Sequence, residues 1–226
     1  MSAAPKRLLT PEEYLAQEEL AEFRSEYYRG EVFAMSGASF HHGRINENLS
    51  QKIGNQLEDS PCQIITRDLR VRVAATGLYT YPDAVIFCGP PELSGGRTAT
   101  LLNPRVLIEI LSDSTEDYDR GGKFVHYRQI PSLQEYVLIA QAEALVEHYV
   151  RQSDGGWLLT ACAVVPKLSS LTGSSCTRIS RSAPPDRSIL PTPGRPCNPR
   201  LTTSSTNQDS SSNVNDGAVT VKVMMA

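Results

Sequence analysis

The stretch Arg105-Val106-Leu107-Ile108-Glu109-Ile110-Leu111 places one carboxylate in the middle of an otherwise aliphatic run. A short continuous apolar run of this kind is typical of a strand that is buried on both faces of a sheet. An ionised carboxylate in such a strand is costly unless it is paired, neutralised or bound to a cation. The alternatives for Glu109 are a solvated edge strand, an arginine partner such as Arg67, Arg70 or Arg72, or a functional site.

A second acid stands at the start of the preceding apolar run, Tyr81-Pro82-Asp83-Ala84-Val85-Ile86-Phe87. Proline is tolerated at the entrance of a strand because it removes no ladder hydrogen bond there. If the two runs form neighbouring strands, about 4.8 Å apart, Asp83 and Glu109 repel each other unless a cation lies between them. The alternative is that Asp83 caps a turn and points to water.

A lysine follows these two acids, in a segment at about 116–130 whose pattern predicts a helix. Gly121-Gly122 precedes Lys123, and each glycine costs about 1 kcal/mol relative to alanine inside a helix. The glycine pair therefore indicates a close backbone approach or a helix that begins later. Lysines on helices usually face solvent, and Asp119 is placed to pair with Lys123 at i,i+4 or to cap the helix. Two acids on strands and one lysine are also the parts of a metal-dependent site that cleaves phosphodiesters.

The segment before residue 60 adds two further candidates. Arg29-Gly30 lies between two aromatic-bearing runs and predicts a hairpin in which Gly30 has a positive φ. Glu31 follows it, either as a surface residue of the hairpin or as a third acid at the site. An amphipathic helix is predicted at about 39–58. Its adjacent His41 and His42 diverge by about 100° and cannot both face one metal. We interpret His41 as a helix-start or packing residue and His42 as a group that approaches a phosphate or a water.

The remaining pattern predicts a mixed α/β fold. Thr10-Pro11-Glu12-Glu13 is a helix start with a capping box. Apolar and polar residues alternate at 69–73, which predicts a half-exposed strand with Arg70 and Arg72 facing outward. Three more strands are predicted at 136–139, 144–150 and 157–165. We therefore expect a central mixed β-sheet flanked by α-helices.

The composition changes beyond about Lys167. Residues 168–226 are rich in Ser, Thr and Pro, and every aromatic residue of the chain lies at or before Trp157. Such a composition cannot bury enough apolar surface to offset its ordering entropy. We therefore predict a domain at 1–167 and a disordered tail at 168–226.

Charge and cysteine content limit the classes of function. Through Trp157 there are 15 Lys and Arg against 22 Asp and Glu, a net charge of −7, which disfavours non-specific nucleic-acid binding. The chain has five cysteines without metal-finger spacing. We interpret Cys62 and Cys88 as small core residues in a reducing cytoplasm. No run of 18 apolar residues exists, so we expect no membrane span.

Taken in order, these residues resemble the Uma-type branch of the PD-(D/E)XK nuclease superfamily, which comprises restriction-endonuclease-like proteins. The resemblance runs from about Leu8 to Val165 and is carried by segments of matching order. They are Gly30-Glu31, Ser39–Leu49 with His42, Tyr81-Pro82-Asp83, Asn103-Pro104, Glu109–Thr115, Asp119–Phe124, Tyr127-Arg128 and Ile130–Tyr136.

The resemblance implies a metal-dependent endonuclease acting on nucleic acid, most simply DNA. Asp83 and Glu109 would hold Mg²⁺ or Mn²⁺, with Glu31, His42 and Asp119 in supporting roles. Lys123 would be the catalytic lysine, because the usual position, two residues after the second acid, is Leu111. The Ser/Pro-rich tail also departs from the family, which usually closes with an apolar strand and helix.

Two questions stay open on the sequence alone. The alternative function is a catalytically inactive or defective nuclease fold that persists as a binding protein, which the acidic domain and the unusual tail favour. The oligomeric state is also open, and a homodimer is compatible with the resemblance.

Overall fold

The structure of the protein is a computed structural model that describes residues 7–35, 37–95, 99–163 and 176–177. The chain divides into two compact units, one of residues 1–183 with 225–226 and the other of residues 184–224. All the described residues belong to the first unit. The predicted disordered tail at 168–226 lies outside the described residues, apart from residues 176–177.

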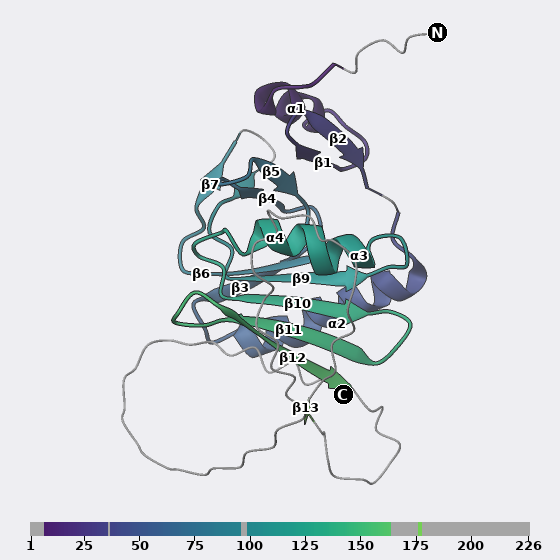
Figure 1. The fold of residues 1–226 in the computed structure, drawn as a ribbon, viewed down its shortest axis with the longest axis vertical. Coiled ribbons are helices and arrows are strands. Elements are labelled where there is room, and N and C mark those ends of the chain that lie inside the picture. The colour runs from purple at the N-terminus through teal and green to yellow at the C-terminus, as the bar shows by residue number, and fades with distance from the viewer. Residues whose placement is uncertain (1–6, 36, 96–98, 164–175, 178–226) are drawn as a thin grey trace, which may run out of the picture. The chain divides into compact units, whose positions relative to one another are not determined.

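A mixed seven-stranded sheet forms the centre of the first unit (Figure 1). The order of its strands is β13-β12-β11-β10-β9-β6-β3. Only β9 and β10 pair in parallel, and the other neighbours are antiparallel. The strands are β3 (Cys62–Thr66), β6 (Ala84–Cys88), β9 (Val106–Leu111), β10 (Glu135–Ala140), β11 (Leu145–Arg151), β12 (Trp157–Ala163) and β13 (Cys176–Thr177).

A second, smaller sheet has the strand order β2-β1-β5-β4-β8-β7. Its strands are β1 (Ser25–Tyr28), β2 (Glu31–Ala34), β4 (Arg70–Val73), β5 (Leu78–Thr80), β7 (Leu93–Ser94) and β8 (Thr100–Leu101). The predicted α/β class with a mixed sheet is confirmed, but the sequence pattern does not distinguish the strands of this second sheet from those of the first.

Helices lie on both faces of the large sheet. The helices are α1 (Pro11–Glu18), α2 (Phe40–Leu57), α3 (Glu116–Tyr118), the π-helix η1 (Asp119–Lys123) and α4 (Phe124–Tyr127). In Figure 1, α3 and α4 cross in front of the sheet and α2 passes behind it, where it packs on β3, β6 and β9. Among the described residues, no helix is both long and apolar enough to cross a membrane.

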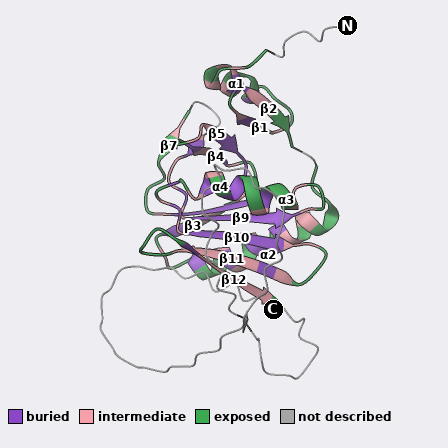
Figure 2. Ribbon diagram, viewed as in Figure 1, coloured by how far each residue is buried: buried purple, intermediate pink, exposed green. Residues whose placement is uncertain are grey.

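The strand that carries Glu109 is buried along its whole length, as predicted (Figure 2). Successive side chains of a strand point to opposite faces of the sheet. Leu107 and Leu111 pack in one hydrophobic core with Phe124 and Tyr127 of α4. Glu109 has the same parity as these two leucines, so its side chain lies on the face that η1 and α4 cover.

The N-terminal hairpin is also confirmed. Arg29 and Gly30 both have positive φ, 48° and 90°, which suits a two-residue hairpin turn. The hairpin joins the second sheet through β1, where Tyr27 pairs with Tyr79. The rings of Tyr14, Tyr27 and Tyr79 form a small aromatic core beside it. The pairing of β1 with β5 therefore attaches the hairpin to the rest of the unit.

The structure corrects the prediction for Arg70 of β4 and adds a link between β3 and β6. Arg70 does not face outward but is 1% exposed, because Thr100 Oγ1 and the Tyr81 hydroxyl accept its guanidinium hydrogen bonds at 2.8 and 3.1 Å. Cys62 is a buried core residue, as predicted, but it also forms a disulfide with Cys88, which was not predicted. They are direct partners in the register of β3 and β6, and their separation of 26 residues hides this in the sequence.

The predicted helix at 116–130 is a short helical segment whose middle turn is a π-helix. A Cβ atom at Gly122 would lie 2.7 Å from the nearest ring carbon of Tyr118, while a Cβ at Gly121 would meet nothing within 4 Å. Gly122 therefore allows the close backbone approach that the glycine pair indicated. π-helical turns occur often at functional sites.

The two glycines give a matched pair of variants. We expect Gly122→Ala to lower the free energy of unfolding by about 1 kcal/mol or more, because the Tyr118 ring must shift. Gly121→Ala should be neutral or slightly stabilising, because alanine restricts the unfolded chain without a clash. Urea denaturation of both variants tests this, and equal losses of stability would contradict the role assigned to Gly122.

Candidate active site

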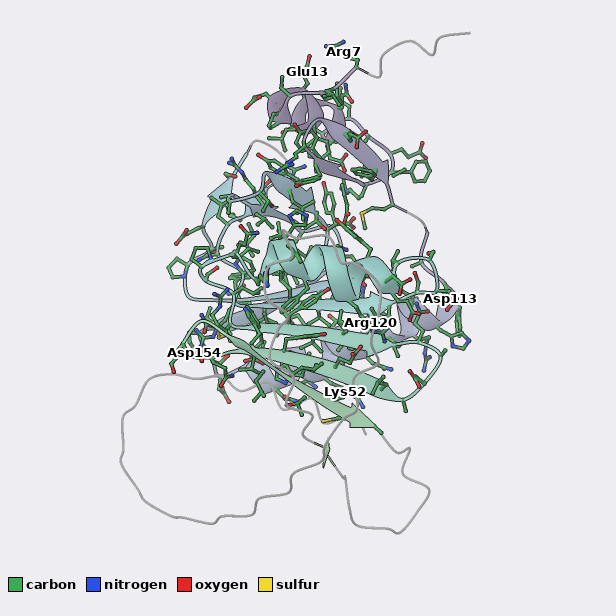
Figure 3. All side chains as sticks on the ribbon, in the orientation of Figure 1. Arg7, Glu13, Lys52, Asp113, Arg120 and Asp154 are labelled. Carbon is green, nitrogen blue, oxygen red and sulfur yellow. A yellow bond between two sulfur atoms is a disulfide. The ribbon has the colours of Figure 1, made fainter. Side chains whose placement is uncertain are left out.

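Asp83, Glu109 and Lys123, the three catalytic candidates, line one open cleft of about 710 Å³. The cleft lies where the first turn of α2, the hairpin of β1 and β2, and the carboxyl end of β9 meet. Asp113, labelled in Figure 3, belongs to its wall just beyond the end of β9. Six acids line the cleft, namely Glu26, Asp68, Asp83, Glu109, Asp113 and Asp119.

Asp83 lies directly before β6, at the position opposite Glu109. The antiparallel register pairs Ala84 with Ile108, so the next pair along the strands is Asp83 with Glu109. One carboxylate oxygen of Asp83 accepts the backbone N–H of Ile110 at 2.7 Å. The other lies 2.8 Å from Nε2 of His42, which stands in the first turn of α2. His42 therefore contacts an acid of the cleft and fixes its orientation.

Glu109 is 3% exposed and makes two contacts through Oε1. The hydroxyl of Tyr127 donates a hydrogen bond to this atom at 2.7 Å, and Nζ of Lys123 lies 3.1 Å from it. Arg70, one of the three arginines considered as partners from the sequence, is bound to Thr100 and Tyr81. A lysine from the following helix thus holds the carboxylate of the buried strand.

The ammonium of Lys123 sits among three carboxylates, although its residue is only 6% exposed. Besides Glu109, it lies 3.2 Å from Glu26 Oε1 and 3.2 Å from Asp119 Oδ1. Asp119 and Lys123 are the first and last residues of η1. The π-turn therefore brings an acid and the lysine of the same turn to the end of β9.

Glu26 is the residue of this cluster that sequence reasoning did not select. It stands on β1, in the second sheet, and its carboxylate also accepts a hydrogen bond from Thr80 Oγ1. Glu31, which was selected as the third acid, is not among the residues that line the cleft. The two acids lie on paired strands of one hairpin. Nothing in the local sequence tells which of them faces the lysine, because that depends on how the hairpin joins β5.

The cluster around Lys123 contains one cation and several acids, and this imbalance of charge affects the protonation of Glu109. Burial raises the pKa of Glu109 to about 8, with further increases from Asp119 and Asp83, while Lys123 and Tyr127 lower it. Burial disfavours the charge of Lys123, but Glu109, Glu26 and Asp119 outweigh it and hold the lysine pKa well above its ordinary value. Near neutral pH the lysine is therefore charged, and Glu109 is the acid that takes up a proton.

The donor atoms suit a hard divalent cation. Mg²⁺ prefers oxygen ligands and is commonly bound through one or two carboxylates, waters and substrate phosphates. Asp83 and Glu109 supply such oxygens side by side, and the buried Asp119 Oδ1 lies nearby with the Lys123 ammonium as its ion-pair partner. Within the described part of the chain, no group of three or more His, Cys, Asp and Glu is arranged to hold a metal by itself. The residues thus fit a cation that is completed by water and substrate, and not a closed protein cage.

The fold is of the restriction-endonuclease-like α/β class, and comparisons with known proteins agree. A family model for Uma2, described as "Putative restriction endonuclease", matches residues 11–180. The chain belongs to this Uma2 family.

Two proteins of Synechocystis sp. (strain ATCC 27184 / PCC 6803 / Kazusa), the uncharacterized proteins sll1609 and slr1290, are similar to the chain. Each is 38% identical to it, over 71% of this chain and 90% of the first relative, and over 70% of this chain and 82% of the second. A crystal structure of "a putative nuclease belonging to DUF820" from Anabaena variabilis ATCC 29413 has a TM-score of 0.55 at 24% identity. The match covers 70% of this chain and 89% of that one.

The charge balance of the cluster leads to a prediction about stability. Lys123→Met should lower the free energy of unfolding by about 3–5 kcal/mol above pH 8, because it leaves buried carboxylates without a cation. Folding raises the pKa of Glu109 from 4.5 to about 8, so the folded state favours the protonated side chain. The stability associated with this group is therefore full below about pH 4.5 and is lost as the pH rises through about 8. Lys123 lowers that pKa, so the deficit of the variant should be smaller near pH 5. Urea denaturation at both pH values measures the difference.

Two further variants complete this experiment. Lys52→Met removes a lysine of α2, labelled in Figure 3, that does not line the cleft, and its effect on stability should be the same at both pH values. The double variant Lys123→Met/Glu109→Gln should recover part of the loss, because it also removes a buried carboxylate. A deficit for Lys123→Met that does not depend on pH would show that lost packing, and not charge, causes it.

Proposed function

We propose that the protein is a metal-dependent endonuclease that hydrolyses phosphodiester bonds of nucleic acid, most simply DNA. The observation that supports this most is the meeting of Asp83, Glu109 and Lys123 in one open cleft. Its acids come from neighbouring strands and its lysine from the following helix. The description of the Uma2 family as restriction endonucleases agrees with the same chemistry.

Asp83 and Glu109 are the proposed ligands of Mg²⁺ or Mn²⁺. When bound, such an ion lowers the pKa of a water and stabilises negative charge on phosphate oxygens. His42 and the Ile110 N–H hold the carboxylate of Asp83 in place, and Tyr127 does the same for Glu109. These contacts keep the two carboxylates oriented toward the cleft before substrate arrives.

Lys123 is the proposed cation that orients the attacking water and stabilises the charge that develops on the phosphate. The oxygen of the water forms a bond to phosphorus while one P–O ester bond breaks. The water gives up one proton to solvent, and the leaving oxygen takes up one proton from solvent, so the protons balance. Lys123 would keep Glu26 and Asp119 as partners if Glu109 held a metal ion. Its ammonium therefore stays at the cleft during the reaction.

The activity is tested by cleavage of labelled DNA by the full chain in the presence of Mg²⁺ or Mn²⁺. We expect Asp83→Ala, Glu109→Ala and Lys123→Ala to reduce the rate by at least about 100-fold, as expected for the loss of an electrostatic group of the transition state. Circular dichroism controls for folding. A folded Glu109→Ala protein that cuts as fast as the parent would refute the mechanism.

The hairpin supplies a matched pair for the third acid. Glu26→Gln should lower kcat, because Lys123 loses one of its three anchoring carboxylates. Glu31→Gln, on the paired strand and outside the cleft lining, should leave kcat unchanged. Equal effects of the two substitutions would argue against a special role for Glu26.

Metal binding should depend on pH in a defined direction. The proposed site needs the ionised form of Glu109, whose pKa is about 8. Mn²⁺ affinity, measured by calorimetry without substrate, should therefore rise about tenfold per pH unit from pH 6 to 8 and level off above it. In Glu109→Gln this dependence should disappear. Affinity that is constant over this range in the parent protein would show that binding does not displace the Glu109 proton.

A further inference from the structure

The rim of the cleft carries exposed aromatic rings next to the charged cluster. Phe33 is 47% exposed and Tyr118 is 42% exposed, and both line the cleft. Large apolar side chains that stay in water and gather at one site mark binding surfaces more often than isolated ones do. The exposed Phe23 and Phe40 directly adjoin Arg24 and Ser39, which also line the cleft.

Both rings lie close to residues of the proposed site. Phe33 is the direct cross-strand partner of Glu26 in the hairpin, so the two side chains share one face. The ring centroid of Tyr118 lies 5.9 Å from Nζ of Lys123. Phe33 is therefore a neighbour of Glu26, which binds Lys123, and Tyr118 is a neighbour of Lys123 itself.

The acidic lining of the cleft makes binding of nucleic acid through electrostatic attraction alone weak. Its lining contains Arg24, Arg67 and Lys123 as permanent cations, against six acids. Lys123 is engaged by carboxylates, and Arg24 lies 3.4 Å from Asp68. Affinity for duplex nucleic acid rests largely on neutralised phosphates and released counterions. This cleft offers few cations for that purpose, so a substrate must gain affinity from another contact.

We infer that the cleft takes nucleic acid whose bases are unpaired beside the scissile phosphate, and that these bases stack on Phe33 and Tyr118. Every base has a flat π face, and stacking on aromatic side chains binds single strands with little sequence preference. In a duplex these faces are stacked on one another and cannot meet the rings. The inference rests on the proposed nuclease function and specifies its substrate class: a single strand, a loop or an open junction.

Fluorescence anisotropy with the full chain in EDTA separates binding from cleavage. We expect a labelled single-stranded oligonucleotide to bind at least about tenfold more tightly than the blunt duplex of the same sequence. Phe33→Leu and Tyr118→Leu keep apolar area but remove a ring, and each should weaken single-strand binding by about five- to tenfold. Leu93→Ala, on β7 and outside the cleft, removes an exposed apolar side chain and should change nothing.

Salt dependence gives an independent readout. Even if Arg24 leaves Asp68 and joins Arg67 in contacting phosphates, the slope of log K against log salt should be no steeper than about −1.4 for a single strand. A steep slope, with no effect of either ring substitution, would overturn the inference. So would equal affinity for duplex and single strand.

Sedimentation distinguishes another occupant of the same surface. If the protein forms a dimer that Phe33→Ser dissociates while oligonucleotide binding is unchanged, the rings belong to an interface between copies and the inference is wrong.

The nuclease proposal and the single-strand proposal can fail separately, and the outcomes differ. Equal cleavage of duplex and single strand keeps the nuclease and overturns the substrate class. Ring-dependent binding without hydrolysis in any metal keeps the binding mode and overturns the nuclease.

Discussion

The ion cluster around the ammonium of Lys123 is the constraint on which the arrangement of the site depends. It joins three elements that are distant in the chain: β1 through Glu26, β9 through Glu109, and η1 through Asp119. A buried carboxylate without a partner is costly, and a buried ammonium is equally so. Each element can therefore occupy its position only while the others occupy theirs.

The π-turn follows from the same constraint. Asp119 and Lys123 must both reach the end of β9, while Phe124 and Tyr127 must pack on the sheet. Gly122 lets the ring of Tyr118 lie against the turn. The glycine pair, which is unfavourable for an ordinary helix, thus suits a turn in which backbone and ring approach closely.

The second sheet takes part in the site as well as in the fold. Its hairpin supplies Glu26 to the lysine and Phe33 to the rim of the cleft. The buried Arg70 and the aromatic core of Tyr14, Tyr27 and Tyr79 lie in or beside this sheet and consolidate it. An acid that anchors the proposed catalytic lysine therefore comes from outside the sheet that carries Asp83 and Glu109.

The sequence by itself determined the features that depend on local pattern. Continuous apolar runs predicted β6 and β9, an amphipathic pattern predicted α2, and Arg29-Gly30 predicted the hairpin. The order of Asp83, Glu109 and Lys123 indicated their site because strand neighbours and the following helix have little freedom in such a fold.

Only the tertiary structure decided which distant residues meet. Alternation predicted an outward Arg70, but pairing of β4 on both sides and the acceptors on Tyr81 and Thr100 turned it inward. Tertiary contacts likewise decided that Glu26 and not Glu31 meets Lys123, and that Cys62 pairs with Cys88. Side chains of equal chemistry on adjacent strands look alike in sequence. The register and the packing of whole sheets determine which of them is buried and beside what.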